Sequence, residues 1–153
     1  MTRYREAFEA RDLDAIVESL APDVVIHSPI SRRVTFRGRE EARRLFEIVL
    51  DLLGETRYTH ELADGDVRVA VFHAQLAGRE MHEVQVMRLD AEGRVKDLTL
   101  FLRPLPGITA LAAALGPRLA RRKGRRAAAV VAAYARPLAV VTEIGDRIST
   151  RFV

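Results

Sequence analysis

Glu83 and His27 are the two side chains in this sequence best suited to move a proton near neutral pH. Met81, Glu83 and Gln85 alternate with Val84 and its neighbours, so on a strand their side chains share one face. A carboxyl group among methionines on a half-buried strand has a raised pKa and can act as an acid or a base. The alternative for Glu83 is a place at the rim, paired with one of the many arginines.

His27 follows three apolar residues and precedes Ser28-Pro29, which end a short apolar run. We expect it at the mouth of any pocket that the strands enclose, where an imidazole is the natural group for proton transfer. The alternative is a core or interface histidine that bonds to backbone. The four histidines show no HxH or HExxH spacing, and the chain has no Cys, so no metal site is expected. No glycine-rich nucleotide fingerprint or phosphate loop occurs either, and we expect no cofactor.

The composition fits a single globular domain. The chain has 153 residues, of which 48% are hydrophobic, enough for a substantial core. The absence of Cys excludes disulfides, thiol nucleophiles and thiolate metal sites. The charged N-terminus lacks the apolar stretch of a signal peptide, and no run of 18 uncharged apolar residues predicts a spanning helix. We therefore expect a cytoplasmic protein.

The net charge of +4 is unevenly distributed along the chain. Residues 1–103 hold 16 basic and 19 acidic residues, whereas residues 104–153 hold 9 basic and 2 acidic ones. The basic character therefore belongs to the C-terminal third alone. A nucleic-acid partner for the whole domain is not expected, because the charge would be in the wrong place.

Three consecutive β-strands must position the candidate residues. They are expected at Val67–Leu76, Glu80–Leu89 and Arg94–Leu102, separated by short polar turns that contain Gly. Both faces of these strands are apolar, so one face should pack on helices and the other should meet a second subunit or the C-terminal segment. The remaining expected elements are helices at 2–10, 13–20 (capped by Asp12) and 39–53 (ended by Gly54), with short strands at 24–27, 32–36 and 56–62.

The pattern changes after Pro104. A short apolar helix is expected at Ile108–Leu115, ended by Gly116-Pro117, and a basic run with six basic residues follows at Arg118–Arg126. A second break is expected at Arg136-Pro137 and a last amphipathic stretch at 138–148. We therefore divide the chain into a domain at 1–116 and a helical extension at 117–153. The extension should pack against the domain, with weak contact of 118–148 with a membrane surface as the alternative.

Three segments carry a resemblance to a known family: ARDLDAIVESLAPDVVIHSPI, FRGREEARRLF and GRVKDLTLFLRP. With the order of elements, they resemble the SnoaL-like, polyketide cyclase-like group of the nuclear transport factor 2-like superfamily, over roughly residues 3–104. The resemblance implies an α+β cone, in which a curved antiparallel sheet and N-terminal helices close a pocket. It also implies a homodimer formed through the convex face. The superfamily includes enzymes, small-molecule binders and interaction modules, so the fold does not choose among them.

Ketosteroid isomerases of this superfamily allow a comparison residue by residue. Tyr4 precedes Asp12 by eight residues and matches the tyrosine that holds the oxyanion. Ser28 stands where those enzymes have the catalytic base, and Gln85 stands where they have a protonated Asp. The isomerase reaction as such is therefore not expected, since serine is no base near pH 7 without an activating partner. The residue set of limonene epoxide hydrolases is not found either.

Two hypotheses follow. In the first, the protein is a cofactor-independent cyclase, isomerase, hydratase or hydrolase that acts by acid–base chemistry on a small hydrophobic molecule. Its catalytic residues would be His27, Glu83 and Tyr4. The ligand-binding residues would be Ser28, Phe72, Gln85, Met87 and Leu100. In the second hypothesis, the protein is a non-catalytic ligand-binding or dimeric interaction module, with a cone that its own apolar side chains fill.

Overall fold

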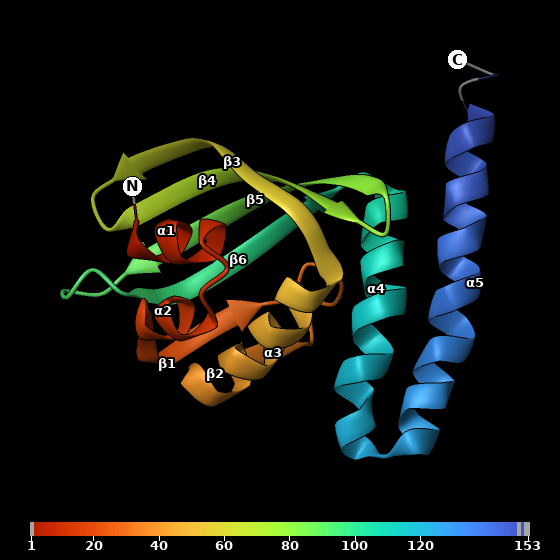
Figure 1. Ribbon diagram of the computed structural model, residues 1–153, viewed down its shortest axis with the longest axis horizontal. Coiled ribbons are helices and arrows are strands. Elements are labelled where there is room, and N and C mark those ends of the chain that lie inside the picture. Colours follow the sequence, from red (N-terminus) through yellow and green to blue (C-terminus); the bar gives the residue numbers. More distant parts are fainter. Residues whose placement is uncertain (1, 150, 152–153) are drawn as a thin grey trace.

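A curved sheet forms the body of the protein, and the helices lie inside the curve and beside it (Figure 1). The computed structural model describes residues 2–149 and 151. Within these residues the sheet has six strands in the order β2-β1-β6-β5-β4-β3, all antiparallel to their neighbours except the parallel pair β1–β6. The strands are β1 (Leu20–His27), β2 (Thr35–Arg37), β3 (Leu53–Asp64), β4 (Val67–Leu76), β5 (Arg79–Leu89) and β6 (Val95–Arg103). The expected α+β cone is confirmed.

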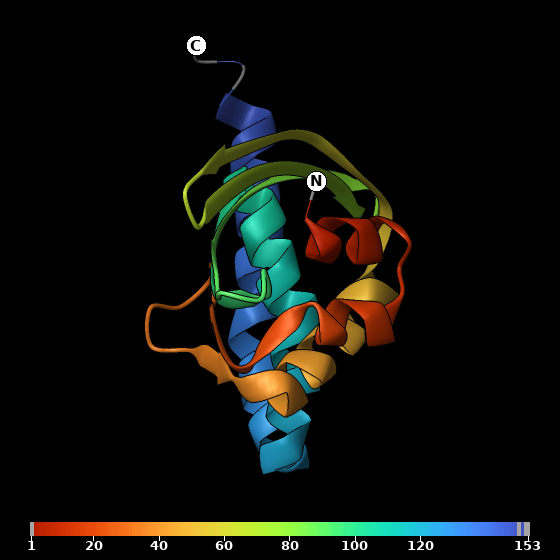
Figure 2. The ribbon, with the colours of Figure 1, turned by 90° about the vertical axis from the view of Figure 1, so that its left-hand side faces the viewer.

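Three helices cover the concave face of the sheet (Figure 2). They are α1 (Arg3–Glu9), α2 (Leu13–Glu18) and α3 (Gly38–Leu52). Thr2 caps α1 by accepting a hydrogen bond from the Arg5 amide, and Asp12 caps α2 by accepting one from the Ala15 amide, as expected for Asp12. Helix α2 ends two residues earlier than expected, because β1 already begins at Leu20.

An aromatic cluster joins the helices to the sheet. The ring of Phe8 on α1 makes edge contacts with Phe46 of α3, Tyr58 of β3 and Phe72 of β4, at centroid distances of 6.1, 6.2 and 5.3 Å. Tyr4, one turn earlier on α1, packs against Phe8 and Phe46. These rings are almost fully buried, and they hold α1 over the inner face of the sheet.

The junction between α3 and β3 differs from the expectation. Gly54 was expected to end the helix at its C′ position, but it is a residue of β3, which begins at Leu53. The guanidinium group of Arg11 closes the helix instead. It donates hydrogen bonds to the carbonyl oxygens of Leu53 and Gly54, at 3.1 Å each, and to that of Leu50. A side chain distant in the sequence therefore satisfies backbone groups that a glycine turn would otherwise satisfy.

The C-terminal third forms a hairpin of two helices, α4 (Leu105–Ala120) and α5 (Arg125–Ser149), joined by the short 3-10 helix η1 (Arg121–Lys123) (Figures 1 and 2). The breaks expected at Pro117 and Pro137 are wrong, because both prolines lie inside continuous helices. Each proline removes one backbone hydrogen bond, and packing of the two helices on each other offsets that loss. The expected domain boundary at residue 116 thus falls within α4.

Helix α4 lies against the open end of the cone and α5 lies outside α4 (Figure 1). The described helices α4 and α5 therefore do not cover the outer face of the sheet, where β4 and β5 present half-buried valines. By length and composition alone, helix α5 is also long and apolar enough to cross a membrane. In its most apolar stretch of 18 residues, 11% is buried inside the protein.

Candidate functional site

The site is a small cavity inside the cone, between the sheet and helices α1, α3 and α4. Its volume is about 50 Å³, and its lining is mostly apolar. Such a volume holds a few water molecules, whereas pockets for drug-sized ligands measure about 300–1,000 Å³. The polar side chains of the lining are those of Tyr4, Ser28, Glu83 and Gln85.

A chain of hydrogen bonds joins Tyr58, Gln85 and Glu83. The Tyr58 hydroxyl donates to Gln85 Oε1 at 2.8 Å, and Gln85 Nε2 donates to Glu83 Oε1 at 2.6 Å. All three residues are buried, with 5%, 1% and 8% of their surfaces exposed. Because the hydroxyl donates to the amide oxygen, the amide nitrogen is directed at the carboxyl group.

Burial sets the protonation of Glu83. Removal from water disfavours the carboxylate, and the hydrogen bond from Gln85 favours it. The first effect is larger, and the pKa of Glu83 rises to about 7. The group is therefore partly protonated at neutral pH, which suits either acceptance or donation of a proton.

Tyr4 brings a second polar group to the cavity from the opposite wall, on α1. Its hydroxyl has no hydrogen-bond partner among the residues that the structure describes. Burial, and then the charge of Glu83, raise the pKa of Tyr4 well above its ordinary value, while nearby Gln85 and Tyr58 act in the opposite direction. Tyr4 therefore remains a neutral donor whose hydrogen bond is available to a ligand.

Helix α4 closes the open end of the cone. Leu111 and Leu115 line the cavity, and they are 6% and 7% exposed. Gly107 lies one turn before Leu111, and a Cβ atom there would lie 3.4 Å from Met81 Cγ. Helix α4 therefore packs closely on β5 and limits the volume of the cavity.

Six of the eight predicted site residues line this cavity, namely Tyr4, Ser28, Phe72, Glu83, Gln85 and Leu100. Met87 does not line it, although it shares the inner face with Glu83 and is fully buried. The structure thus brings Tyr4 and Glu83 to one void, as the first hypothesis requires of those two residues.

His27 lies elsewhere, on the outer face of the sheet. Ile26 is fully buried, so its neighbour His27 must point outward from β1. There His27 Nε2 is 2.9 Å from Asp97 Oδ2 of β6, within hydrogen-bond distance, and both side chains are about 40% exposed. The expected position of His27 at the pocket mouth is therefore wrong, and this geometry gives no support to His27 as an acid or base that acts in the cavity.

Tyr58 was not predicted as a site residue. It lies on a strand that was expected, but the pairing of β3 with β4 shifts between Tyr58 and His60. Such an irregularity changes which residues of a strand face inward, and alternation alone does not reveal it. The lining leucines of α4, Leu111 and Leu115, lie in the helix that was expected at 108–115, but they were missed because no local pattern places that helix against the cavity.

No group of three or more His, Asp or Glu side chains in the described part of the chain is placed to hold a metal ion. The polar groups at the cavity are one carboxyl group with a shifted pKa, one phenol, one amide and the hydroxyl of Ser28. Such a set can move a proton and stabilise a developing oxyanion.

Comparisons with known proteins agree with this architecture. The chain belongs to the SnoaL-like domain family, whose sequence pattern matches residues 1–98. A steroid delta-isomerase from Pseudomonas aeruginosa is 30% identical, with a TM-score of 0.70 over 78% of this chain and 88% of that one. No curated protein sequence matches this chain.

Two further solved structures share the fold. A bacterial protein with a cystatin-like fold from Silicibacter pomeroyi is 24% identical, with a TM-score of 0.72 over 82% of this chain and 91% of that one. An epoxide hydrolase/cyclase-like enzyme with a role in pyran ring formation in the polyether salinomycin is 21% identical, with a TM-score of 0.56 over 66% of this chain and 84% of that one.

Proposed function

We propose that this SnoaL-like protein is a cofactor-independent enzyme that transfers a proton on a small hydrophobic carbonyl compound, as in an isomerisation or cyclisation. The observation that carries the proposal is the carboxyl group of Glu83, whose pKa is about 7 inside an apolar cavity. A carboxyl group in this state is suited to general acid–base catalysis near neutral pH.

Each polar group of the cavity has a role in the proposed step. Deprotonated Glu83 removes a proton from the carbon next to the carbonyl. The electron pair of that C–H bond forms a carbon–carbon double bond, and the π electron pair of the carbonyl moves onto its oxygen. The free hydroxyl of Tyr4 donates to the oxyanion that forms. Protonated Glu83 then returns the proton to another carbon, or the enolate carbon attacks a second carbonyl carbon of the same molecule and Glu83 protonates the alkoxide that forms. Gln85 holds the carboxyl group in place through its 2.6 Å hydrogen bond.

The similar proteins support a reaction of this class. One is named a steroid delta-isomerase and another an epoxide hydrolase/cyclase-like enzyme. In this chain Ser28 lines the cavity at the position that the sequence comparison assigned to an isomerase base. We therefore propose Glu83 on β5 as the base of this protein, in place of a residue at position 28.

A substrate requires the cavity to widen. The 50 Å³ void is too small for an organic substrate. Helix α4 of the C-terminal hairpin forms one wall of this void. We propose that α4 shifts outward when the substrate enters. The substrate would be small and largely apolar, because Leu111 and Leu115 would remain in contact with it.

Proton exchange tests the proposal directly. The protein is incubated in D₂O with a panel of cyclic and linear ketones, and deuterium next to the carbonyl is measured by mass spectrometry. We expect exchange above the buffer rate for at least one ketone, lost in Glu83→Gln and retained in the matched Glu80→Gln, since Glu80 is exposed on the same strand. Exchange that persists in Glu83→Gln would contradict the role of Glu83.

The small cavity favours one other function, a non-catalytic binding or interaction module. In that case a ketone or another apolar ligand would bind without exchange, and Glu83→Gln would change affinity alone. Calorimetry beside the exchange assay separates the two functions.

The homodimer and the cytoplasmic location of the protein stay predictions. A homodimer through the outer face is supported by half-buried Val84 and Val86 and by Phe101, which is 56% exposed. Analytical ultracentrifugation of wild type and Phe101→Glu tests it. The cytoplasmic location is tested by cell fractionation.

A further inference from the structure

Helix α5 exposes an unusual amount of apolar surface. Among the described residues, seven large hydrophobic side chains of this one helix are exposed: Val130, Tyr134, Leu138, Val140, Val141, Ile144 and Ile148. A soluble helix of a monomer ordinarily turns such side chains inward. An apolar environment outside the protein is therefore expected for this face.

Five of these residues form a continuous stripe. Val130, Tyr134, Val141, Ile144 and Ile148 follow each other at steps of four, seven, three and four, which places them along one side of a helix. We call these residues the α5 stripe. The charged residues between its ends project from other sides of the helix: Arg136, Glu143, Asp146 and Arg147.

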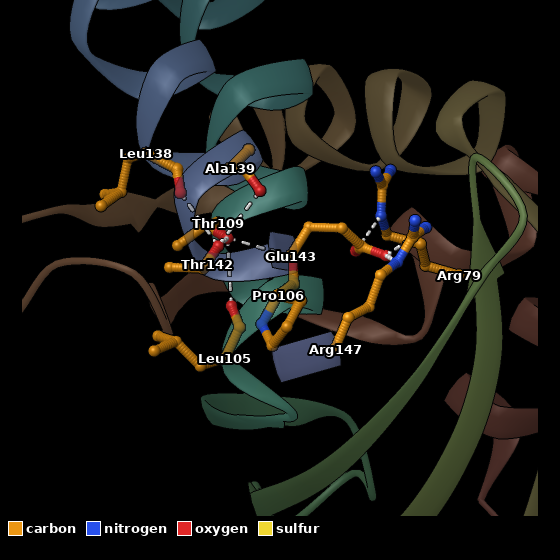
Figure 3. Close-up of polar contacts among 9 residues, drawn as sticks. All are labelled: Arg79, Leu105, Pro106, Thr109, Leu138, Ala139, Thr142, Glu143 and Arg147. Atoms are coloured by element: carbon orange, nitrogen blue, oxygen red, sulfur yellow. Dashed lines mark hydrogen bonds and ion pairs between the residues drawn. The ribbon is translucent and has the colours of Figure 1, made fainter. Parts of the chain in front are cut away.

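The opposite side of α5 holds it to the body. Thr142 and Thr109 of α4 share a hydrogen bond of 2.6 Å, and Arg79 Nε donates to Glu143 Oε2 at 2.7 Å (Figure 3). Ala128 and Ala135 are buried on this side. These small and polar residues hold one side of α5 against the rest of the protein. The α5 stripe, on the opposite side of the helix, therefore points away from the protein.

A cluster of cations adjoins one end of the stripe. Arg121, Arg122, Lys123, Arg125 and Arg126 lie at the tip of the hairpin, and Arg126 is one turn before Val130. We call these five residues the basic tip. None of them forms an ion pair with a described carboxylate, whereas Arg118 nearby is paired with Asp51. The basic tip thus carries uncompensated positive charge beside uncompensated apolar surface.

We propose that the α5 stripe and the basic tip bind the surface of an anionic lipid bilayer. One partner must supply both anions and an apolar phase, and the headgroup and acyl regions of such a bilayer do so. A nucleic acid would match the basic tip but not the stripe. A second copy would cover the stripe but would bring further cations, since residues 104–153 hold 9 basic and 2 acidic residues.

The composition of α5 favours a position along the surface over a span. Arg136 lies near the middle of the helix and is exposed, and a charge at the centre of a bilayer is costly. Tyr134 belongs to the stripe, is 63% exposed and is suited to the region between headgroups and acyl chains. This inference does not depend on the proposed enzymatic function.

Vesicle flotation with the full chain tests the proposal. The probes are vesicles of phosphatidylcholine alone and of phosphatidylcholine mixed with phosphatidylglycerol. We expect wild type to float with the anionic vesicles at low salt, and to dissociate at high salt because the charges are screened. Val141→Asp, in the stripe, should weaken binding about tenfold. Arg122→Glu combined with Lys123→Glu should weaken it by a similar factor or more.

Matched controls separate these effects from general damage. Leu62→Asp introduces the same charge at an apolar side chain that is 68% exposed, close to the 64% of Val141, but that lies on β3, outside the helical hairpin. Arg32→Glu combined with Arg33→Glu makes the same charge change in an exposed loop. Both controls should float like wild type, and circular dichroism should show unchanged helix content in all variants.

Several results would overturn the proposal. Wild type that stays unbound with anionic vesicles at low salt removes the lipid surface as the partner. If that protein instead forms dimers that Val141→Asp dissociates, a second copy covers the stripe. Equal flotation of Val141→Asp and Leu62→Asp would show that another surface binds the lipid.

Discussion

Gln85 Nε2 lies 2.6 Å from Glu83 Oε1, two residues apart on β5, and both side chains point into the cone. This bond acts against the effect of burial on the carboxyl group, and burial remains the larger effect. Tyr58 fixes the orientation of the amide from the other side. The protonation of Glu83 therefore depends on a short chain of hydrogen bonds between buried side chains. A single substitution can remove each of these bonds.

The stability of the folded protein should depend on pH through Glu83. Its pKa is about 7 in the folded state, above the ordinary value of 4.5, so the folded state binds the proton more tightly than the unfolded state. The contribution of Glu83 to stability is therefore fully present below the unfolded pKa and is lost as pH rises through the folded pKa. From about pH 5 to about pH 8 we expect wild type to lose about 2–3 kcal/mol from this group.

Glu83→Gln should lack this loss, because its side chain does not titrate. Urea unfolding of both proteins at several pH values measures the difference in free energy of unfolding. Above neutral pH the variant should be the more stable protein, and the two curves should converge in acid. Parallel curves would show that Glu83 titrates normally.

Removal of the amide of Gln85 should raise the pKa of Glu83 further. Gln85→Met keeps the volume of the side chain but removes the hydrogen bond that favours the carboxylate. In Tyr58→Phe, by contrast, the bond from Gln85 to Glu83 remains and only the donor to Gln85 Oε1 is lost. NMR titration of the Glu83 carboxyl carbon should give a larger upward shift for Gln85→Met than for Tyr58→Phe. The reverse order would contradict the direct role of Gln85.

Helix α4 should act as a wall of the cavity. Leu111→Ala removes a lining side chain that is 6% exposed, and we expect a loss of about 2–5 kcal/mol together with a larger cavity. Leu105→Ala changes a leucine of the same helix that is 60% exposed, so its cost should stay within about 0.5 kcal/mol. Urea unfolding measures both. If α4 closes the site, Leu111→Ala should also bind an apolar fluorescent probe more tightly than wild type.

The sequence was sufficient to predict the three consecutive strands β4, β5 and β6, and to predict which side chains of β4 and β5 face the inside of the cone. Phe72, Glu83 and Gln85 alternate with outward valines, and the pairing of β4 with β5 has no irregularity, so the expected faces of β4 and β5 are confirmed. Where pairing shifts, alternation gives no such guide. Val95 is 1% exposed although it has the parity of outward residues, because the pairing of β5 with β6 shifts between Arg88 and Leu89.

The helical hairpin was the least predictable part. Pro117 and Pro137 are ordinarily signals that end helices, and both were treated as such. Only the contact between α4 and α5 shows why the helices continue, and that contact joins residues far apart in the sequence, as between Thr109 and Thr142. The closing of the cavity by α4 was therefore not visible in the local pattern.

His27 Nε2 and Asp97 Oδ2 are 2.9 Å apart on the outer face of the sheet, where both side chains are partly exposed. His27→Ala should change the free energy of unfolding by less than about 1 kcal/mol, since exposed pairs contribute little. It should also leave the titration of Glu83 unchanged, because the sheet separates the two side chains. Ketone exchange in D₂O should likewise persist in His27→Ala. Loss of exchange in this variant, with stability retained, would return His27 to the proposed catalytic residues.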